Sequence, residues 1–162
     1  MPEYRIRETG QVMYEDELRR WASATTGASW GQTTGEVLEI IGADPVFEGP
    51  QATTVPPYEY SMRHGVEQIE GKWYTKYVAG PIFTDTPEAT AAEQEAAYKA
   101  RLDAEQSDRV RADRNARLAA CDWTQVLDAP VDTAVWAAYR QDLRDVPSQA
   151  GFPWEVSWPV AP

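Results

Sequence analysis

The chain has 162 residues, a formal net charge of −11 and 43% hydrophobic residues, which is typical of one globular domain or two small ones. The negative charge argues against binding to nucleic acid or to anionic membranes, because both require a cationic surface. A single cysteine excludes an intrachain disulfide, and no apolar run approaches the length of a membrane span. The first ten residues, MPEYRIRETG, contain no apolar core, so we expect no signal peptide and a cytoplasmic protein.

Glycine and proline divide the sequence into two parts. Most of the ten glycines lie within residues 1–85, whereas residues 88–121 contain neither glycine nor proline. We therefore predict an α+β protein: an antiparallel β-rich domain over 1–85, followed by a helical domain over 86–162 with one long helix and one short helix.

The chain begins with patterns for a hairpin and a helix. Residues 4–8 (YRIRE) and 10–14 (GQVMY) predict two short paired strands. Residues 15–22 (EDELRRWA) predict a helix, because their apolar residues are spaced to share one face.

The next segments are less regular. Residues 25–35 predict a loop whose glycines lack the lysine and the spacing of a phosphate-binding loop. Residues 37–41 fit either a short helix or a strand. Residues 42–57 are rich in proline and predict irregular structure.

Residues 58–78 (YEYSMRHGVEQIEGKWYTKYV) carry the clearest strand pattern, because apolar and polar residues alternate at its start. His64-Gly65 and Glu70-Gly71 are plausible two-residue turns. The segment therefore predicts a three-stranded antiparallel meander.

The aromatic residues of this meander have two alternative roles. A small sheet with one buried face needs such residues in its core, and this role is the more common one. Alternatively they bind a partner strand or a sugar, and Trp73, Tyr74 and Tyr77 are then the best candidates for exposure. The candidate partner-binding residues are Tyr58, Tyr60, Trp73, Tyr74 and Tyr77.

A long helix is predicted over residues 87–121. Thr86 can cap it, Pro87 fits its first position, and alanine supplies helix propensity throughout. At about 1.5 Å per residue it would be roughly 50 Å long. Its large apolar residues form only a thin stripe, which consists of Tyr98, Leu102, Val110 and Leu118. Because one short helix and a tail cannot cover such an element, this stripe indicates self-association.

A second, shorter helix is predicted over residues 133–145. Asp132 can cap it, and it should end before Pro147. Trp136, Tyr139 and Leu143 share one of its faces. The chain then ends in an extended segment that contains Phe152, Trp154 and Trp158.

No arrangement of residues predicts catalysis or metal binding. Cys121 would need a base to act as a nucleophile, and the only histidine, His64, lies in the other half of the chain. We interpret Cys121 as a small packing residue at a helix end. The acidic residues 15–17 are more simply solvated charges than a glycosidase pair. We therefore expect no catalytic residue, no metal and no cofactor.

Three segments in the C-terminal half form an ordered set of motifs. They are residues 114–130 (RNARLAACDWTQVLDAP), 136–147 (WAAYRQDLRDVP) and 151–159 (GFPWEVSWP). Together they resemble the C-terminal domain of phage tail assembly chaperones. Residues 42–50 and 65–78 also resemble the N-terminal half that is often joined to that domain.

The resemblance implies a non-enzymatic, ATP-independent chaperone that assists folding and trimeric assembly of the distal part of a phage tail fibre. On this hypothesis residues 1–85 bind the fibre, and residues 86–162 self-associate, as a homotrimer that matches a trimeric fibre. The protein would act in the host bacterial cytoplasm during virion assembly, and its retention on the virion stays open. The candidate oligomerisation and packing residues are Tyr98, Leu102, Val110, Leu118, Trp123, Trp136, Tyr139, Leu143 and Trp154.

Two other functions remain as alternatives. The protein could be a permanent structural component of the fibre or baseplate, or a cysteine hydrolase that uses Cys121. We interpret residues 120–125 (ACDWTQ) as the end of the long helix running into a loop, with Trp123 as the packing anchor.

Overall fold

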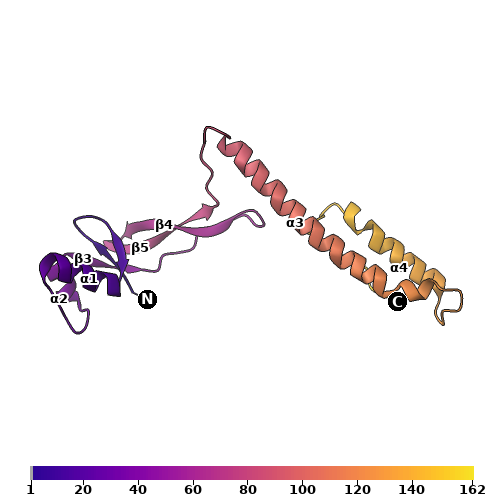
Figure 1. Cartoon of the computed structure of the whole chain (residues 1–162), viewed down its shortest axis with the longest axis horizontal. Coiled ribbons are helices and arrows are strands. Elements are labelled where there is room, and N and C mark those ends of the chain that lie inside the picture. Colours follow the sequence, from indigo (N-terminus) through magenta and orange to yellow (C-terminus); the bar gives the residue numbers. More distant parts are fainter. Residues whose placement is uncertain (1) are drawn as a thin grey trace. The chain divides into compact units, whose positions relative to one another are not determined.

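The computed structural model describes residues 2–162, and the chain divides into two compact units, residues 1–82 and 83–162. The N-terminal unit contains a five-stranded sheet with the strand order β2-β1-β3-β5-β4 (Figure 1). The β3/β5 pair is parallel and the other pairs are antiparallel. The strands are β1 (Glu3–Ile6), β2 (Val12–Tyr14), β3 (Ala43–Phe47), β4 (Tyr60–Ile69) and β5 (Lys72–Gly80). The α+β prediction is confirmed.

Two helices cover one end of this sheet. Helix α1 (Glu15–Thr26) confirms the predicted helix, and Gly27 ends it in the left-handed conformation. Residues 37–41, which the sequence left open, belong to helix α2 (Gly35–Ile41), because the Thr34 hydroxyl accepts a hydrogen bond from the amide of Val37. The core of the unit consists of Tyr4, Ile6, Met13, Leu18, Ala22, Leu38, Ile41 and Ala43.

Strand β3 corrects the prediction of irregular structure over residues 42–57. The strand contains Pro45, which cannot donate to a ladder. Pro45 pairs with Tyr4 of β1, but the pairing of β3 with β5 begins only at Val46. Proline is therefore tolerated because β5 does not pair with β3 at that position.

The predicted three-stranded meander is also wrong, because residues 60–80 form one long hairpin of two strands. The Glu70-Gly71 turn is confirmed: both residues have positive φ, 49° and 80°, as a two-residue type I′ turn requires. At His64-Gly65, however, β4 does not reverse. Its register with β5 shifts there, so the two residues form a bulge in one continuous strand.

The C-terminal unit is built on helix α3 (Ala91–Ala120), which begins later than predicted. The Thr90 hydroxyl accepts from the Glu93 amide, and the Glu93 carboxylate accepts from the Thr90 amide at 2.8 Å. This reciprocal capping box needs Glu three residues after the cap. Thr86 lacks such a partner and instead forms a turn with Ala89, so its predicted role as the cap is wrong.

Helix α4 (Thr133–Asp145) confirms the second predicted helix and its Asp132 cap. It lies beside the C-terminal half of α3 (Figure 1), and the connection begins with a short 3₁₀ helix, η1 (Asp122–Gln125). A second 3₁₀ helix, η2 (Val146–Ser148), leads into the C-terminal tail. The core consists of Cys121, Tyr139 and Leu143, against which Leu118, Trp136 and Trp158 pack.

Candidate interaction surfaces

One face of the sheet is covered by helices over only half of its width. Tyr4 and Ala43 lie on the covered face, within the core formed with α1 and α2. Because side chains alternate along a strand, Phe47 lies on the same face as Ala43. Tyr74 of β5 is paired with Phe47, and the two rings are 5.7 Å apart. The covered face therefore continues onto the β5/β4 hairpin.

The register of the hairpin assigns the remaining residues of that face. Alternate residues of β5 from Tyr74 to Val78 share it, and so do their partners on β4, which include Met62. Beyond the helices the face exposes apolar and aromatic side chains, with Tyr60 52% exposed. Charged residues lie among them: Lys76 pairs with Glu67 at 3.9 Å, and Lys72 lies 6.0 Å from the ring centroid of Phe47. We call the apolar and aromatic group the open patch, and it comprises Phe47, Tyr60, Met62, Ile69, Tyr74 and Val78.

The opposite face of the hairpin is satisfied within its own unit. The Arg5 guanidinium lies 4.0 Å from the ring centroid of Trp73, and the Tyr77 hydroxyl donates to the Glu48 carboxylate at 2.6 Å. On the same face Arg63 forms an ion pair with Glu3. This face is therefore a poorer site for a partner than the open patch.

The structure thus separates the five candidate partner-binding residues. Tyr60 and Tyr74 lie on the open patch, whereas Trp73 and Tyr77 lie on the opposite face. Tyr58 lies in the turn that precedes β4. The role of all five in binding stays a prediction. Sequence reasoning missed Phe47, because its strand was not recognised.

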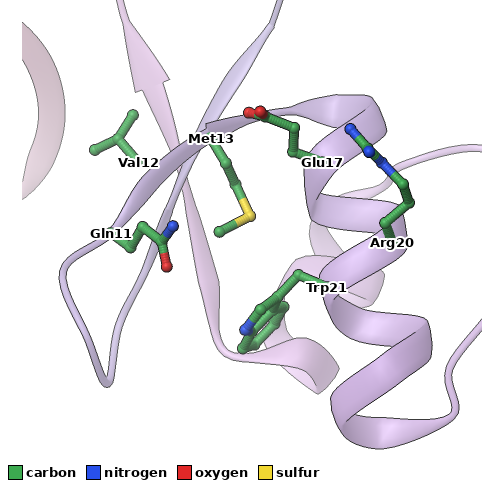
Figure 2. Close-up of a pocket in the computed structure, with 6 residues that line it drawn as sticks. All are labelled: Gln11, Val12, Met13, Glu17, Arg20 and Trp21. Atoms are coloured by element: carbon green, nitrogen blue, oxygen red, sulfur yellow. The ribbon is translucent and has the colours of Figure 1, made fainter.

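A depression of about 340 Å³ lies between β2 and α1 (Figure 2). Met13 and Trp21 supply its apolar surface, and Glu17 and Arg20 supply its charges. The other side chains that line it are Gln11 and Val12.

In the helical unit, Arg140 joins α4 to the end of α3. Its guanidinium donates to the Leu118 carbonyl at 2.9 Å and to the Asp122 carboxylate at 2.7 Å, and lies 3.1 Å from the Cys121 sulfur. The hydrogen bond to Asp122 raises the pKa of Arg140. A cation here is also favoured by the negative end of the α3 dipole. Thr124, fully buried, completes the joint by donating to the Cys121 carbonyl at 2.7 Å.

These contacts between the end of α3 and α4 explain the structural role of Cys121. Its sulfur is buried and donates to the Leu118 carbonyl at 3.2 Å, and its other polar contact is a permanent cation. Neither group is a general base, so these contacts are structural. Trp123, predicted as the packing anchor, is 50% exposed, and the buried positions of the joint are instead Cys121 and Thr124. Sequence reasoning missed Arg140, although two of the quoted motifs contain the contacting residues.

The C-terminal tail binds along α3. The Trp154 indole donates to the Asp103 carboxylate at 2.6 Å, and Arg117 lies 4.4 Å from the ring centroid of Trp158. The Gln149 side chain donates to the carbonyl of Ser157 and accepts from its amide. The tail therefore supplies part of the apolar cover that α3 requires.

Most of the candidate oligomerisation residues already have partners in this unit. Val110 is buried, Leu118, Trp136, Tyr139 and Leu143 belong to the core, and Trp154 contacts α3. Tyr98 lies against Phe83, with ring centroids 5.6 Å apart, and Leu102 is half-buried. A role for any of them in self-association stays a prediction.

The tip of the α3–α4 hairpin exposes a second apolar group of residues. Trp123 contacts Trp136 with ring centroids 6.1 Å apart but leaves half of its surface exposed. Val126, Leu127 and Val135 are exposed nearby in the sequence. Exposed apolar groups of this kind are typical of protein–protein contacts.

Residues 2–162 lack two other features. No His, Cys, Asp and Glu side chains there form a group that could hold a metal ion. No helix in the same range is long and apolar enough to cross a membrane.

Comparison with known proteins gives one match. No curated protein and no solved structure matches the chain. Residues 107–162, about a third of the chain, match the family described as phage tail assembly chaperone protein. The matched range contains the Arg140 joint, α4 and the tail. The C-terminal part of this chain is therefore similar to phage tail assembly chaperones, as its three motifs predicted.

Proposed function

We propose that the protein is a non-enzymatic, ATP-independent chaperone that binds the distal part of a phage tail fibre and assists its folding and assembly. The observation that carries this proposal is the family match over residues 107–162, within the helical unit. Fibre chains expose unpaired strand edges before they assemble, and a binding partner can protect those edges. The protein would act in the host cytoplasm while virions assemble.

The open patch is the proposed client-binding surface. Its apolar and aromatic side chains lie beside helices that cover the rest of the same face, and they include the exposed Tyr60. The charged neighbours Glu67 and Lys76 on this face are paired with each other. A folding chain that exposes apolar side chains would bury them there.

The helical unit is the proposed oligomerisation domain, with a trimer as the expected state. Most residues in the N-terminal half of α3 are exposed, and Phe83 packs on Tyr98 there. The tip around Trp123 is also exposed. Linking three client-binding units would raise the effective concentration of three fibre chains.

Co-expression with the neighbouring fibre gene tests the proposal. We expect correctly oligomeric, soluble fibre only when this protein is present. The double variant Tyr60→Glu/Ile69→Glu places charges on the open patch and should abolish the effect. The control Ala79→Glu places a charge at an exposed position on the opposite face of the hairpin, on β5 and away from the outer edge of β4, and should retain it. Equal fibre yield without the protein would refute the proposal.

Two further measurements test its details. Light scattering on the full chain should give the mass of a trimer, and a monomer at all concentrations would refute the oligomer. Purified virions should lack the protein if it leaves the fibre. A fixed ratio of protein to fibre in virions would favour the alternative, a permanent structural component.

A further inference from the structure

Strand β4 is an edge of the sheet, and its backbone shows which groups are unpaired. The two-residue turn makes Ile69 and Lys72 a hydrogen-bonded pair. Backbone N–H and C=O groups alternate in direction along β5. Those of Tyr74 therefore also bond to β4, whereas those of Thr75 point away from β4. The carbonyl of Thr75 does lie against Gly49, where a Cβ atom would come within 2.0 Å of its oxygen.

The same alternation identifies the free groups of β4. Residues of β4 that pair with Trp73, Thr75, Tyr77 and Ala79 have their backbone N–H and C=O directed away from β5. These four outward residues are Ser61, Arg63, Val66 and Gln68. The bulge lies in the middle of the set and interrupts the edge locally, which leaves two outward residues on each side of it.

We infer that β4 binds its client by strand addition: an extended segment of the fibre chain pairs with the outer edge of β4 and covers the open patch beside it. This inference rests on the proposed function and adds how the client is held. Backbone hydrogen bonds supply affinity in such a complex, and alternate side chains supply specificity. On the patch side the client residues would meet Tyr60, Met62 and Ile69.

The charges along the edge favour a foreign strand over a second copy of this chain. Two copies of β4 can pair antiparallel with outward groups matched, Ser61 opposite Gln68 and Arg63 opposite Val66. In that register Glu59, just before the strand of each copy, comes close to Glu70, in the turn of the other. Like charges opposite one another destabilise a strand pair, so self-pairing is disfavoured at both ends.

The same charges describe the preferred client strand. Glu59 and Glu70 flank the two ends of β4, whereas the charges between them are paired within the unit, Glu67 with Lys76 and Arg63 with Glu3. A client strand with apolar residues at alternate positions and with Lys or Arg near its ends would match this edge.

Amide hydrogen exchange by NMR tests the inference on the full chain, with the distal fragment of the fibre polypeptide from the same phage as the probe. In the free protein the amides of Met62 and Glu67, which donate to β5, should exchange slowly, and the four outward amides should exchange fast. In the complex the outward amides should slow by at least about tenfold.

The variant Gln68→Pro removes one outward donor and no bond to β5, and Pro is tolerated at such edge positions. It should weaken fibre binding by at least about tenfold, whereas the control Gln68→Val, which keeps the N–H, should bind normally.

Each outcome is decisive. A complex in which the outward amides exchange as fast as before would overturn strand addition and leave the chaperone proposal standing. Protection that appears without fibre and grows with protein concentration would show self-pairing and overturn the inference. If no complex forms and the fibre matures alone, the chaperone proposal fails, and the inference fails with it.

Discussion

Replacement of Arg140 by Met tests whether the joint between α3 and α4 stabilises the helical unit. Arg140 contacts Leu118, Cys121 and Asp122 through one guanidinium, and its side chain is only 11% exposed. Met keeps the apolar stem in place, so the variant isolates the polar contacts.

The expected cost follows from these contacts. A hydrogen bond from a charged donor, here to the part-buried carbonyl of Leu118, contributes about 1.5–3 kcal/mol. The Asp122 carboxyl is 67% exposed, so solvent screens that ion pair, and we assign it at most about 0.5 kcal/mol. We therefore expect Arg140→Met to lower the free energy of unfolding by roughly 2–3 kcal/mol. Arg140→Lys, which keeps the charge but not the fork of donors, should cost less.

Urea unfolding of the full chain measures this cost, because urea leaves the ion pair unscreened. Circular dichroism is a suitable signal, since α3 and α4 hold most of the helical residues. The matched control is Arg144→Met, an exposed position one turn further along α4, which should change stability by less than about 0.5 kcal/mol. If Arg140→Met and Arg144→Met unfold at the same urea concentration, the joint does not stabilise the unit as we argue.

Three other substitutions have defined outcomes. Hydrogen bonding to Arg63 lowers the pKa of Glu3. The ionised carboxylate therefore stabilises the fold above the pKa of Glu3 in the unfolded chain, and this stabilisation is lost as the pH falls through the lower folded-state pKa. Glu3→Gln should reduce the melting temperature near pH 7 but not near pH 2. Thr90→Ala should cost about 1 kcal/mol of stability and Thr86→Ala only a few tenths, and the reverse order in urea unfolding would restore Thr86 as the cap. Trp158→Ala should cost roughly 2–3 kcal/mol, below the value for a fully buried aromatic, and an unchanged urea midpoint would show that the tail is not part of the core.

Local signals predicted much of the fold. The turn at Glu70-Gly71, the Asp132 cap and the apolar spacing of α1 are each written in a few neighbouring residues. The motifs around Cys121 predicted the family match in the same way. Such features need no distant partner, so a reading of the sequence can find them.

Other features depend on residues far apart in the chain. Strand β3 contains a proline and is a strand because β1 and β5 lie on either side of it. The bulge at His64-Gly65 exists because β5 pairs with β4 on both sides of it. Neither pairing leaves a pattern within the segment itself, so local propensity gave the wrong answer.

The candidate sites also divide into features that depend on neighbouring residues and features that depend on residues far apart in the chain. The sequence alone determined that this chain has two halves, a sheet and a helical part, and that the helical part has the motifs of a tail assembly chaperone. Only the tertiary structure decided which side chains are available to a partner: it separated Tyr60 and Tyr74 from Trp73 and Tyr77, and it placed Arg140 on Cys121. The physical reason is that exposure and hydrogen bonding depend on strand register and helix packing, which are long-range properties of the folded chain.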